Sequence, residues 1–175
     1  IMMVDELISC LQNFAKEDFP VYEVSNYLNN LPLNDVSLND YAFFEKDFYT
    51  RNLIHREKDF EIILICWPSK TNAPIHGHEG EKCWARVENG NLQIGNYERL
   101  SKSPLKLNLI NELSCDPGYL DGPADLHSVK NITEDFATSL HIYAKPYDAC
   151  DIYDLDKGTI DRKSLGYYSV KGVIS

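Results

Sequence analysis

The sequence has little positive charge and no long hydrophobic run. It holds 17 Lys and Arg against 27 Asp and Glu in 175 residues, so its formal net charge is -10. Because phosphate groups are bound by clustered basic side chains, we expect neither a nucleic acid nor an anionic membrane surface as a partner. The longest apolar run, Ile-Ile-Leu-Ile-Cys at 62–66, falls far short of the roughly 20 residues that a helix needs to cross a bilayer. A small-molecule ligand fits this composition better.

The cysteines form an odd, scattered set. The five cysteines are Cys10, Cys66, Cys83, Cys115 and Cys150. Their odd number and the absence of a CxxC pair argue against a disulfide framework and against a thiolate zinc site. Residues 1–14 also lack a basic leader with a small-residue cleavage site, so we expect no signal peptide in this stretch. These features predict a cytoplasmic protein, and we expect it to be a monomer.

Length and composition predict one domain over residues 1–175. Hydrophobic residues make up 43% and charged residues 25% of the chain, which is ordinary for a globular protein, and the length is short for two domains. Near the start, apolar residues recur at helical spacing, at Val4, Leu7, Ile8, Leu11 and Phe14. This spacing predicts a helix. Further short helices are expected between residues 19 and 47, so the helical part covers about 1–48.

From about residue 49 the sequence changes to short runs of β-branched and aromatic residues separated by Gly, Asn and Pro. The runs are FEIILICW (60–67), KCWARVE (82–88), NLQIGNYE (91–98), LKLNLINEL (105–113) and TSLHIYA (138–144). Asn89-Gly90, between two of these runs, is a strong hairpin signal. This rhythm is typical of an antiparallel barrel or sandwich, and we assign residues 49–175 to it.

Histidine is also scarce, with five in the chain, yet His76 and His78 lie one residue apart. On a strand, side chains at i and i+2 point the same way, so these two imidazoles could share a metal ion. An isolated HxH is weak support, because most such pairs are surface or core histidines. His127 suits a third ligand from a separate strand. His55, in the charged stretch Ile-His-Arg-Glu-Lys-Asp, is expected to be solvated.

A second polar pattern lies near residue 140. Ser139, His141 and Tyr143 alternate with Leu140 and Ile142, which places the polar side chains together on one strand face. That face could line a polar site, or it could face solvent.

The order and spacing of these residues resemble the two-part cupin motif. His76 and His78 are followed by Cys83 and Gly90, and His127 is followed three residues later by Asn131. Cys83 stands where a standard cupin carries a glutamate ligand. With YTRNL (49–53), CWP (66–68), LHSVKN (126–131) and SLHIY (139–143), the pattern resembles the type I cysteine dioxygenases between about residues 49 and 150. The resemblance implies a mainly β fold, namely a cupin-type, jelly-roll-like antiparallel β-barrel with a few N-terminal α-helices.

The resemblance also implies an iron site and a substrate. In this family Fe(II) is bound by three histidines, which correspond to His76, His78 and His127, and it converts L-cysteine and O2 to cysteine sulfinic acid. Arg51 corresponds to the arginine that pairs with the substrate carboxylate, and Tyr49 to its neighbour in the pocket. Three neutral imidazoles leave the full double charge on the ion and open positions for the substrate, and an arginine can hold a carboxylate in a bidentate, charge-assisted pair.

Other residues match residues that lie around the iron site in this family. Cys83 and Tyr143 correspond to a pair that forms a thioether crosslink, Ser139 and His141 to a polar relay leading to that tyrosine, and Cys150 to a cysteine near the entrance. The family usually has Ser-Pro with a cis bond after the tyrosine. This chain has Ala144, Lys145 and Pro146 instead, so the sequence leaves the isomer of the Ala-Lys bond open.

Alternative interpretations stay open for the residues and for the function. Arg51 could form a surface ion pair, Cys83 could be a small buried hydrophobe, and Tyr143 could be an edge aromatic. The function could be that of a dioxygenase for another small thiol, such as 3-mercaptopropionate or cysteamine, although Arg51 argues against this. It could also be that of a non-catalytic cupin that binds a ligand, or of a zinc-dependent isomerase on the same barrel.

Overall fold

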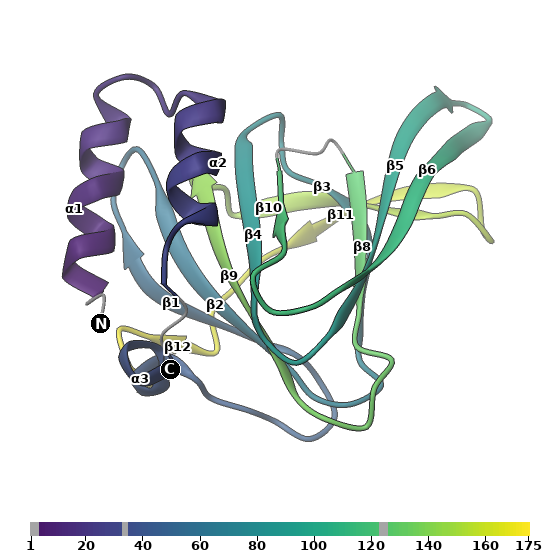
Figure 1. Ribbon diagram of the computed structural model, residues 1–175. Helices are drawn as coiled ribbons and strands as arrows, with labels where there is room; N and C mark the ends of the chain where they lie inside the picture. Colours follow the sequence, from purple (N-terminus) through teal and green to yellow (C-terminus); the bar gives the residue numbers. More distant parts are fainter. Residues whose placement is uncertain (1–3, 33–34, 123–125) are drawn as a thin grey trace.

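The computed structural model describes residues 4–32, 35–122 and 126–175 (Figure 1). Its helices are α1 (Val4–Ala15), α2 (Val21–Asn29), α3 (Asp35–Leu38) and the 3-10 helix η1 (Asn39–Tyr41). The predicted N-terminal helix is therefore confirmed, as are short helices between residues 19 and 47, where residues 33 and 34 lie outside the described residues. No helix in the described parts is long and apolar enough to span a membrane.

All described strands follow the helices, and they form two sheets. The strands are β1 (Thr50–Arg56), β2 (Glu61–Trp67), β3 (Asn72–Gly77), β4 (Lys82–Asn89), β5 (Leu92–Lys102), β6 (Leu105–Cys115), β7 (Leu120–Asp121), β8 (Leu126–Lys130), β9 (Ala137–Ala144), β10 (Ala149–Asp154), β11 (Thr159–Ser164), β12 (Ser169–Val170) and β13 (Val173–Ile174). One sheet has the order β13-β12-β1-β2-β9-β4-β7, and the other has the order β11-β10-β3-β8-β5-β6. Neighbouring strands are antiparallel except for the parallel pair β1 and β12.

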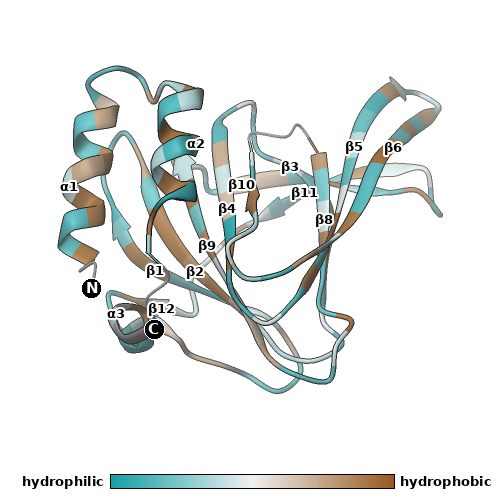
Figure 2. Ribbon diagram, in the orientation of Figure 1, coloured by the Kyte–Doolittle hydropathy of each residue, from teal (hydrophilic) through white to brown (hydrophobic). Residues whose placement is uncertain are grey.

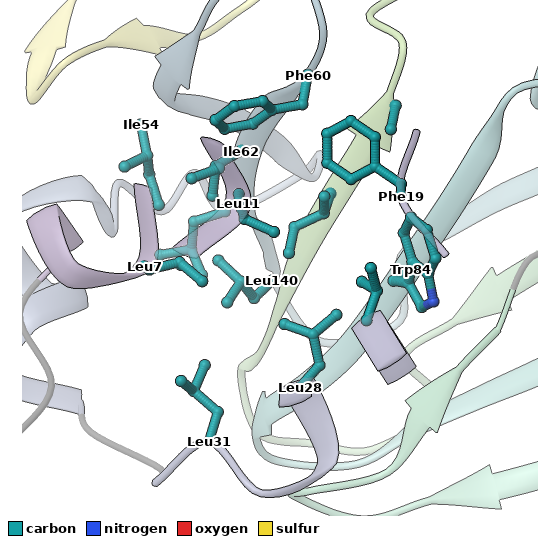
Figure 3. Packing of buried hydrophobic residues seen from close by; sticks show 14 of the residues in the cluster. Leu7, Leu11, Phe19, Leu28, Leu31, Ile54, Phe60, Ile62, Trp84 and Leu140 are labelled. Atoms are coloured by element: carbon teal, nitrogen blue, oxygen red, sulfur yellow. The ribbon is translucent and has the colours of Figure 1, made fainter. Parts of the chain in front are cut away.

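The helices cover the outer face of the seven-stranded sheet. Leu7 and Leu11 of α1 and Leu28 of α2 pack against Ile62 of β2 and Leu140 of β9 (Figure 3). Figure 2 shows hydrophobic colour along β2, the strand that runs through the centre of this face. Because buried apolar area contributes most of the stability of a fold, this layer anchors the helices to the sheet.

A second apolar cluster lies between the two sheets. It includes Ile63 and Trp67 of β2, Ile94 of β5, Val129 of β8 and Tyr143 of β9. Residues of β2 and β9 therefore alternate between the helix-facing cluster and the interior cluster, as the two-residue period of a strand requires. The prediction of a mainly β, cupin-type, jelly-roll-like antiparallel barrel with N-terminal helices is confirmed. The single domain over 1–175 stays a prediction.

The Asn89-Gly90 turn is present, but the predicted hairpin is wrong. The turn joins β4 of the seven-stranded sheet to β5 of the six-stranded sheet, and each of these two strands pairs with other strands. Gly90 has φ +76°, and a Cβ atom there would lie 2.5 Å from the carbonyl oxygen of Phe136. Only glycine satisfies both the positive φ and this close approach. The turn thus fixes the start of β5, whose partner β8 carries His127.

Candidate metal centre and its pocket

The three histidines predicted as metal ligands converge in the interior of the barrel. His76 on β3 and His127 on β8 are direct cross-strand partners, and His78 follows β3 by one residue. The Nε2 atom of His127 lies 3.1 Å from that of His78 and 3.1 Å from that of His76. Their ligand atoms all lie within 4.8 Å of one another. The predicted convergence is confirmed, although β3 itself ends at Gly77.

The outer hydrogen bonds of two of these rings fix their tautomers. His76 Nδ1 lies 2.7 Å from the carbonyl oxygen of Pro74, which can only accept a hydrogen bond. His127 Nδ1 lies 3.0 Å from Oδ2 of Asp121, whose carboxylate also accepts. Both Nδ1 atoms therefore carry the hydrogen in the neutral rings, and both Nε2 atoms present a lone pair. Two lone pairs at 3.1 Å repel each other unless a proton or a metal ion lies between them.

The distances fit a metal ion. Imidazole nitrogens bind a metal such as zinc at roughly 2.0 to 2.1 Å, so two nitrogens on one ion lie about 2.8 to 3.4 Å apart in octahedral to tetrahedral geometry. The two Nε2 separations fall in this range. Loss of hydration, reinforced by the neighbouring His127, lowers the pKa of His76 to about 3. That ring is therefore neutral, and able to act as a ligand, across the physiological pH range.

Arg51 and Tyr49 line the same cavity as His76 and His127. Arg51 is the second residue of β1, and its Nη1 donates a hydrogen bond of 2.6 Å to the carbonyl oxygen of Gly166. Tyr49 precedes β1 and packs against Trp67, with ring centroids 4.7 Å apart. The structure thus brings both predicted substrate-binding residues to the cavity lined by these histidines.

The polar face of β9 points inward, so the solvent-facing alternative is wrong. Ser139, His141 and Tyr143 are all buried. Trp67 Nε1, which can only donate, lies 2.9 Å from Ser139 Oγ, and Ser139 Oγ lies 2.7 Å from His141 Nε2. His141 Nδ1 lies 3.2 Å from the hydroxyl of Tyr143.

One direction of these hydrogen bonds leaves the Tyr143 hydroxyl free to donate. If Ser139, which accepts from Trp67, donates to His141 Nε2, the neutral His141 ring carries its hydrogen on Nδ1 and donates it to Tyr143. Burial, followed by the neighbouring His127, holds the pKa of His141 well below its usual range, which keeps the ring neutral. The hydroxyl hydrogen of Tyr143 is then available to the cavity that this residue lines.

Cys83 and Tyr143 are direct cross-strand partners on β4 and β9. The Cys83 thiol is buried, and burial raises its pKa. Its polar contacts are the carbonyl oxygen of Glu81 at 3.8 Å and the hydroxyl of Tyr147 at 4.0 Å. Cys150 also lines the cavity. The Ala144-Lys145 bond, left open by the sequence, is cis.

Sequence reasoning missed three residues at this site. Asp121 orients His127, Tyr147 contacts the Cys83 thiol, and Tyr167 lies under Arg51 with the guanidinium carbon 5.3 Å from the ring centroid. The signal for Asp121 was its position six residues before His127, but a single acidic residue in a turn is too common to single out.

His55 lies apart from the site and pairs with Glu57 at 2.7 Å. Its side chain is 23% exposed, so it is only partly solvated.

Comparisons with known proteins agree with this geometry. A family model described as cysteine dioxygenase type I matches residues 2–156. Cysteine dioxygenase type 1 of Bos taurus is 28% identical over 169 residues, covering 93% of this chain and 84% of the relative. The human protein of the same name is 27% identical with the same coverage. Among solved structures, TT1209 from Thermus thermophilus matches with a TM-score of 0.51 and 18% identity over 62% of this chain and 95% of that chain, which shows a shared fold.

Proposed function

The chain belongs to the cysteine dioxygenase type I family, and from this membership we propose that it is a thiol dioxygenase that converts L-cysteine and O2 to cysteine sulfinic acid. The observation that carries the proposal is the convergence of the Nε2 atoms of His76, His78 and His127, two of which present lone pairs toward each other. Such an arrangement suits a bound cation. The proposed ion is Fe(II), which imidazole ligands suit.

When bound, iron would supply the electron chemistry that makes dioxygen reactive toward a thiolate. The three ligands are neutral, so the protein adds no negative charge to the ion. An incoming cysteine would supply that charge through its thiolate. Asp121 supports this arrangement by accepting from His127 Nδ1, which fixes the ring orientation.

Arg51 is the proposed clamp for the substrate carboxylate. A guanidinium has five N–H donors in a planar fork, and Arg51 gives one hydrogen bond to Gly166. The side chain lines the cavity next to His76, so a carboxylate held by Arg51 would place the attached thiol on the metal side. This clamp favours thiols that carry a carboxylate, as L-cysteine does, over cysteamine, which has none.

Tyr143 is the proposed hydrogen-bond donor to the reacting groups. In the tautomer in which His141 Nδ1 donates to the Tyr143 oxygen, the Tyr143 hydroxyl hydrogen can be directed to the substrate sulfur or to the transferred oxygen. We also propose that the Cys83 sulfur becomes linked to the Tyr143 ring, with loss of two hydrogen atoms to dioxygen. The cross-strand pairing of the two residues supports this link.

Two alternatives are tested by the same experiment. A dioxygenase for cysteamine or 3-mercaptopropionate would oxidise those thiols in preference to L-cysteine, whereas a non-catalytic binding protein would consume no oxygen with any thiol. Oxygen uptake by the iron-loaded protein with this panel separates the three functions. The proposal requires L-cysteine to be the preferred substrate. We further propose that the protein acts as a monomer in the cytoplasm.

A further inference from the structure

The segment 165–168, between β11 and β12, is fixed against β1 at the position of Arg51. The backbone nitrogen of Tyr168 donates to the carbonyl oxygen of Arg51 at 2.7 Å, and β12 continues the contact by pairing with β1 in parallel. Buried Ser169 adds a side-chain hydrogen bond of 2.7 Å to Asn52. Figure 1 shows β12 beside β1, and only β13 lies beyond β12 on this side of the seven-stranded sheet. On the other side, the backbone nitrogen of Leu165 donates to the carbonyl oxygen of Asp148 at 2.8 Å, so contacts on either side of Gly166 and Tyr167 set the position of this segment.

Two consecutive residues of this segment hold the guanidinium group of Arg51. The carbonyl oxygen of Gly166 accepts from Nη1 at 2.6 Å, and the guanidinium carbon lies 5.3 Å from the centre of the Tyr167 ring. The second contact is in the range of a cation–π interaction. Together the carbonyl and the ring restrict a side chain that otherwise has several rotamers.

The hydroxyl of Tyr167 is fixed by charged side chains on the far side of its ring. Arg56 Nη1 donates to this hydroxyl at 2.7 Å, and the hydroxyl donates to Oε1 of Glu61 at 2.9 Å. Glu61 is fully buried, and Arg56 is held in turn by Asp148 at 2.8 Å. Because both its lone pair and its hydrogen are used, the phenol cannot turn without breaking a hydrogen bond to a charged group.

We propose that Tyr167 is a positioning residue that holds Arg51 in the orientation needed to bind the substrate carboxylate, and so sets the preference for thiols that carry one. The inference rests on the proposed function. Tyr167 acts through Arg51 and contacts neither the three histidines nor the reacting sulfur. Its loss should therefore weaken the binding of L-cysteine and leave cysteamine, which has no carboxylate, unaffected.

The test compares Tyr167→Phe and Tyr167→Leu with Tyr168→Phe as a matched control. Tyr167→Phe keeps the ring and removes the hydrogen bonds to Arg56 and Glu61, and Tyr167→Leu removes the ring as well. The control removes the hydroxyl of the neighbouring tyrosine, which bonds Glu45 on another side of the segment. Each iron-loaded protein is assayed for kcat and KM with L-cysteine, for the inhibition constant of cysteamine in that assay, and for its unfolding midpoint in urea.

Tyr167→Leu is expected to raise the KM for L-cysteine about threefold to thirtyfold, the range of a cation–π contact. Its kcat and the inhibition constant of cysteamine should stay near the wild-type values. The KM of Tyr167→Phe for L-cysteine should lie between those of wild type and Tyr167→Leu, and the KM of Tyr168→Phe should equal that of wild type. An unchanged KM for L-cysteine would overturn the inference, as would an equal rise in the KM for L-cysteine and in the inhibition constant of cysteamine. If that equal rise came with a lower urea midpoint, Tyr167 would have a purely structural role. Absence of oxygen uptake by the wild-type protein would instead refute the proposed function.

Discussion

Asp121 Oδ2 lies 3.0 Å from His127 Nδ1, with both side chains buried, on the side of the ring opposite the metal-facing nitrogen. A carboxylate in this position orients the imidazole and raises its basicity as a ligand. The contact spans β7 and β8, and β7 is itself held to the sheet by β4. The geometry of the three-histidine cluster therefore depends on a residue that would not itself contact a bound metal ion.

Replacing this carboxylate should weaken metal binding. For Asp121→Asn we expect a loss of about tenfold to hundredfold in Fe(II) affinity, because the amide carries no charge and can also present a donor to His127. A titration against a competing chelator measures the affinity. Asp116→Asn, at an exposed aspartate, is the control and should bind as wild type. Equal affinity of Asp121→Asn and wild type would show that the carboxylate does not support the metal site.

Arg51 should determine the affinity for the substrate. Arg51→Ala is expected to raise the KM for L-cysteine by roughly 10- to 150-fold, since a charge-assisted hydrogen-bonded contact contributes about 1.5 to 3 kcal/mol. Steady-state oxygen uptake gives the value. Arg99→Ala, at an exposed arginine of β5, should leave KM unchanged. An unaltered KM in Arg51→Ala would show that the carboxylate is bound elsewhere.

The proposed thioether can be detected by mass. After turnover the intact protein should contain a form lighter by two hydrogen atoms, with Cys83 and Tyr143 joined in one peptide after digestion. Tyr143→Phe and Cys83→Ser should both abolish this form. Tyr147→Phe tests the phenol that lies 4.0 Å from the Cys83 thiol: the form should persist in this variant. Its loss there, with the link kept in Tyr143→Phe, would assign the crosslink to Tyr147.

His141 should make the stability of the metal-free protein depend on pH. Burial depresses its folded pKa well below the usual 6.5, so between these two values the unfolded chain binds a proton that the folded chain does not. The free energy of unfolding must then fall as the pH drops below about 6.5, by up to about 1.4 kcal/mol per pH unit from this residue. Urea unfolding from about pH 7 to about pH 5, the range in which an ordinary histidine titrates, should give a shallower decline in His141→Gln than in wild type. Parallel curves would mean that His141 has the same pKa in the folded and unfolded chain.

Local patterns were sufficient to predict many of the strands and the grouping of His76 with His78. Strand alternation correctly placed Ser139, His141 and Tyr143 on one face, and the spacing of His76 and His78 correctly brought both rings to one centre. Periodicity reports which side chains share a face, so it could predict these groupings but not by itself which face would be inside.

The residues that were missed depend on contacts between distant segments. Tyr167 meets Arg51 only because β12 returns to pair with β1. Tyr147 reaches Cys83 across a loop after β9. The sequence around Tyr167 is polar and turn-rich, with no period that predicts a partner. Such contacts follow from the tertiary fold, and a single sequence contains no local signal for them.

Three neutral imidazoles that hold one ferrous ion, at which L-cysteine receives both atoms of dioxygen, are the centre of the proposed function. The most direct measurement is the ratio of oxygen consumed to cysteine sulfinic acid formed by the iron-loaded protein. We predict equal amounts of the two, with no product from His127→Ala. Consumption of cysteine with cystine as the product, or equal activity of wild type and His127→Ala, would contradict this mechanism.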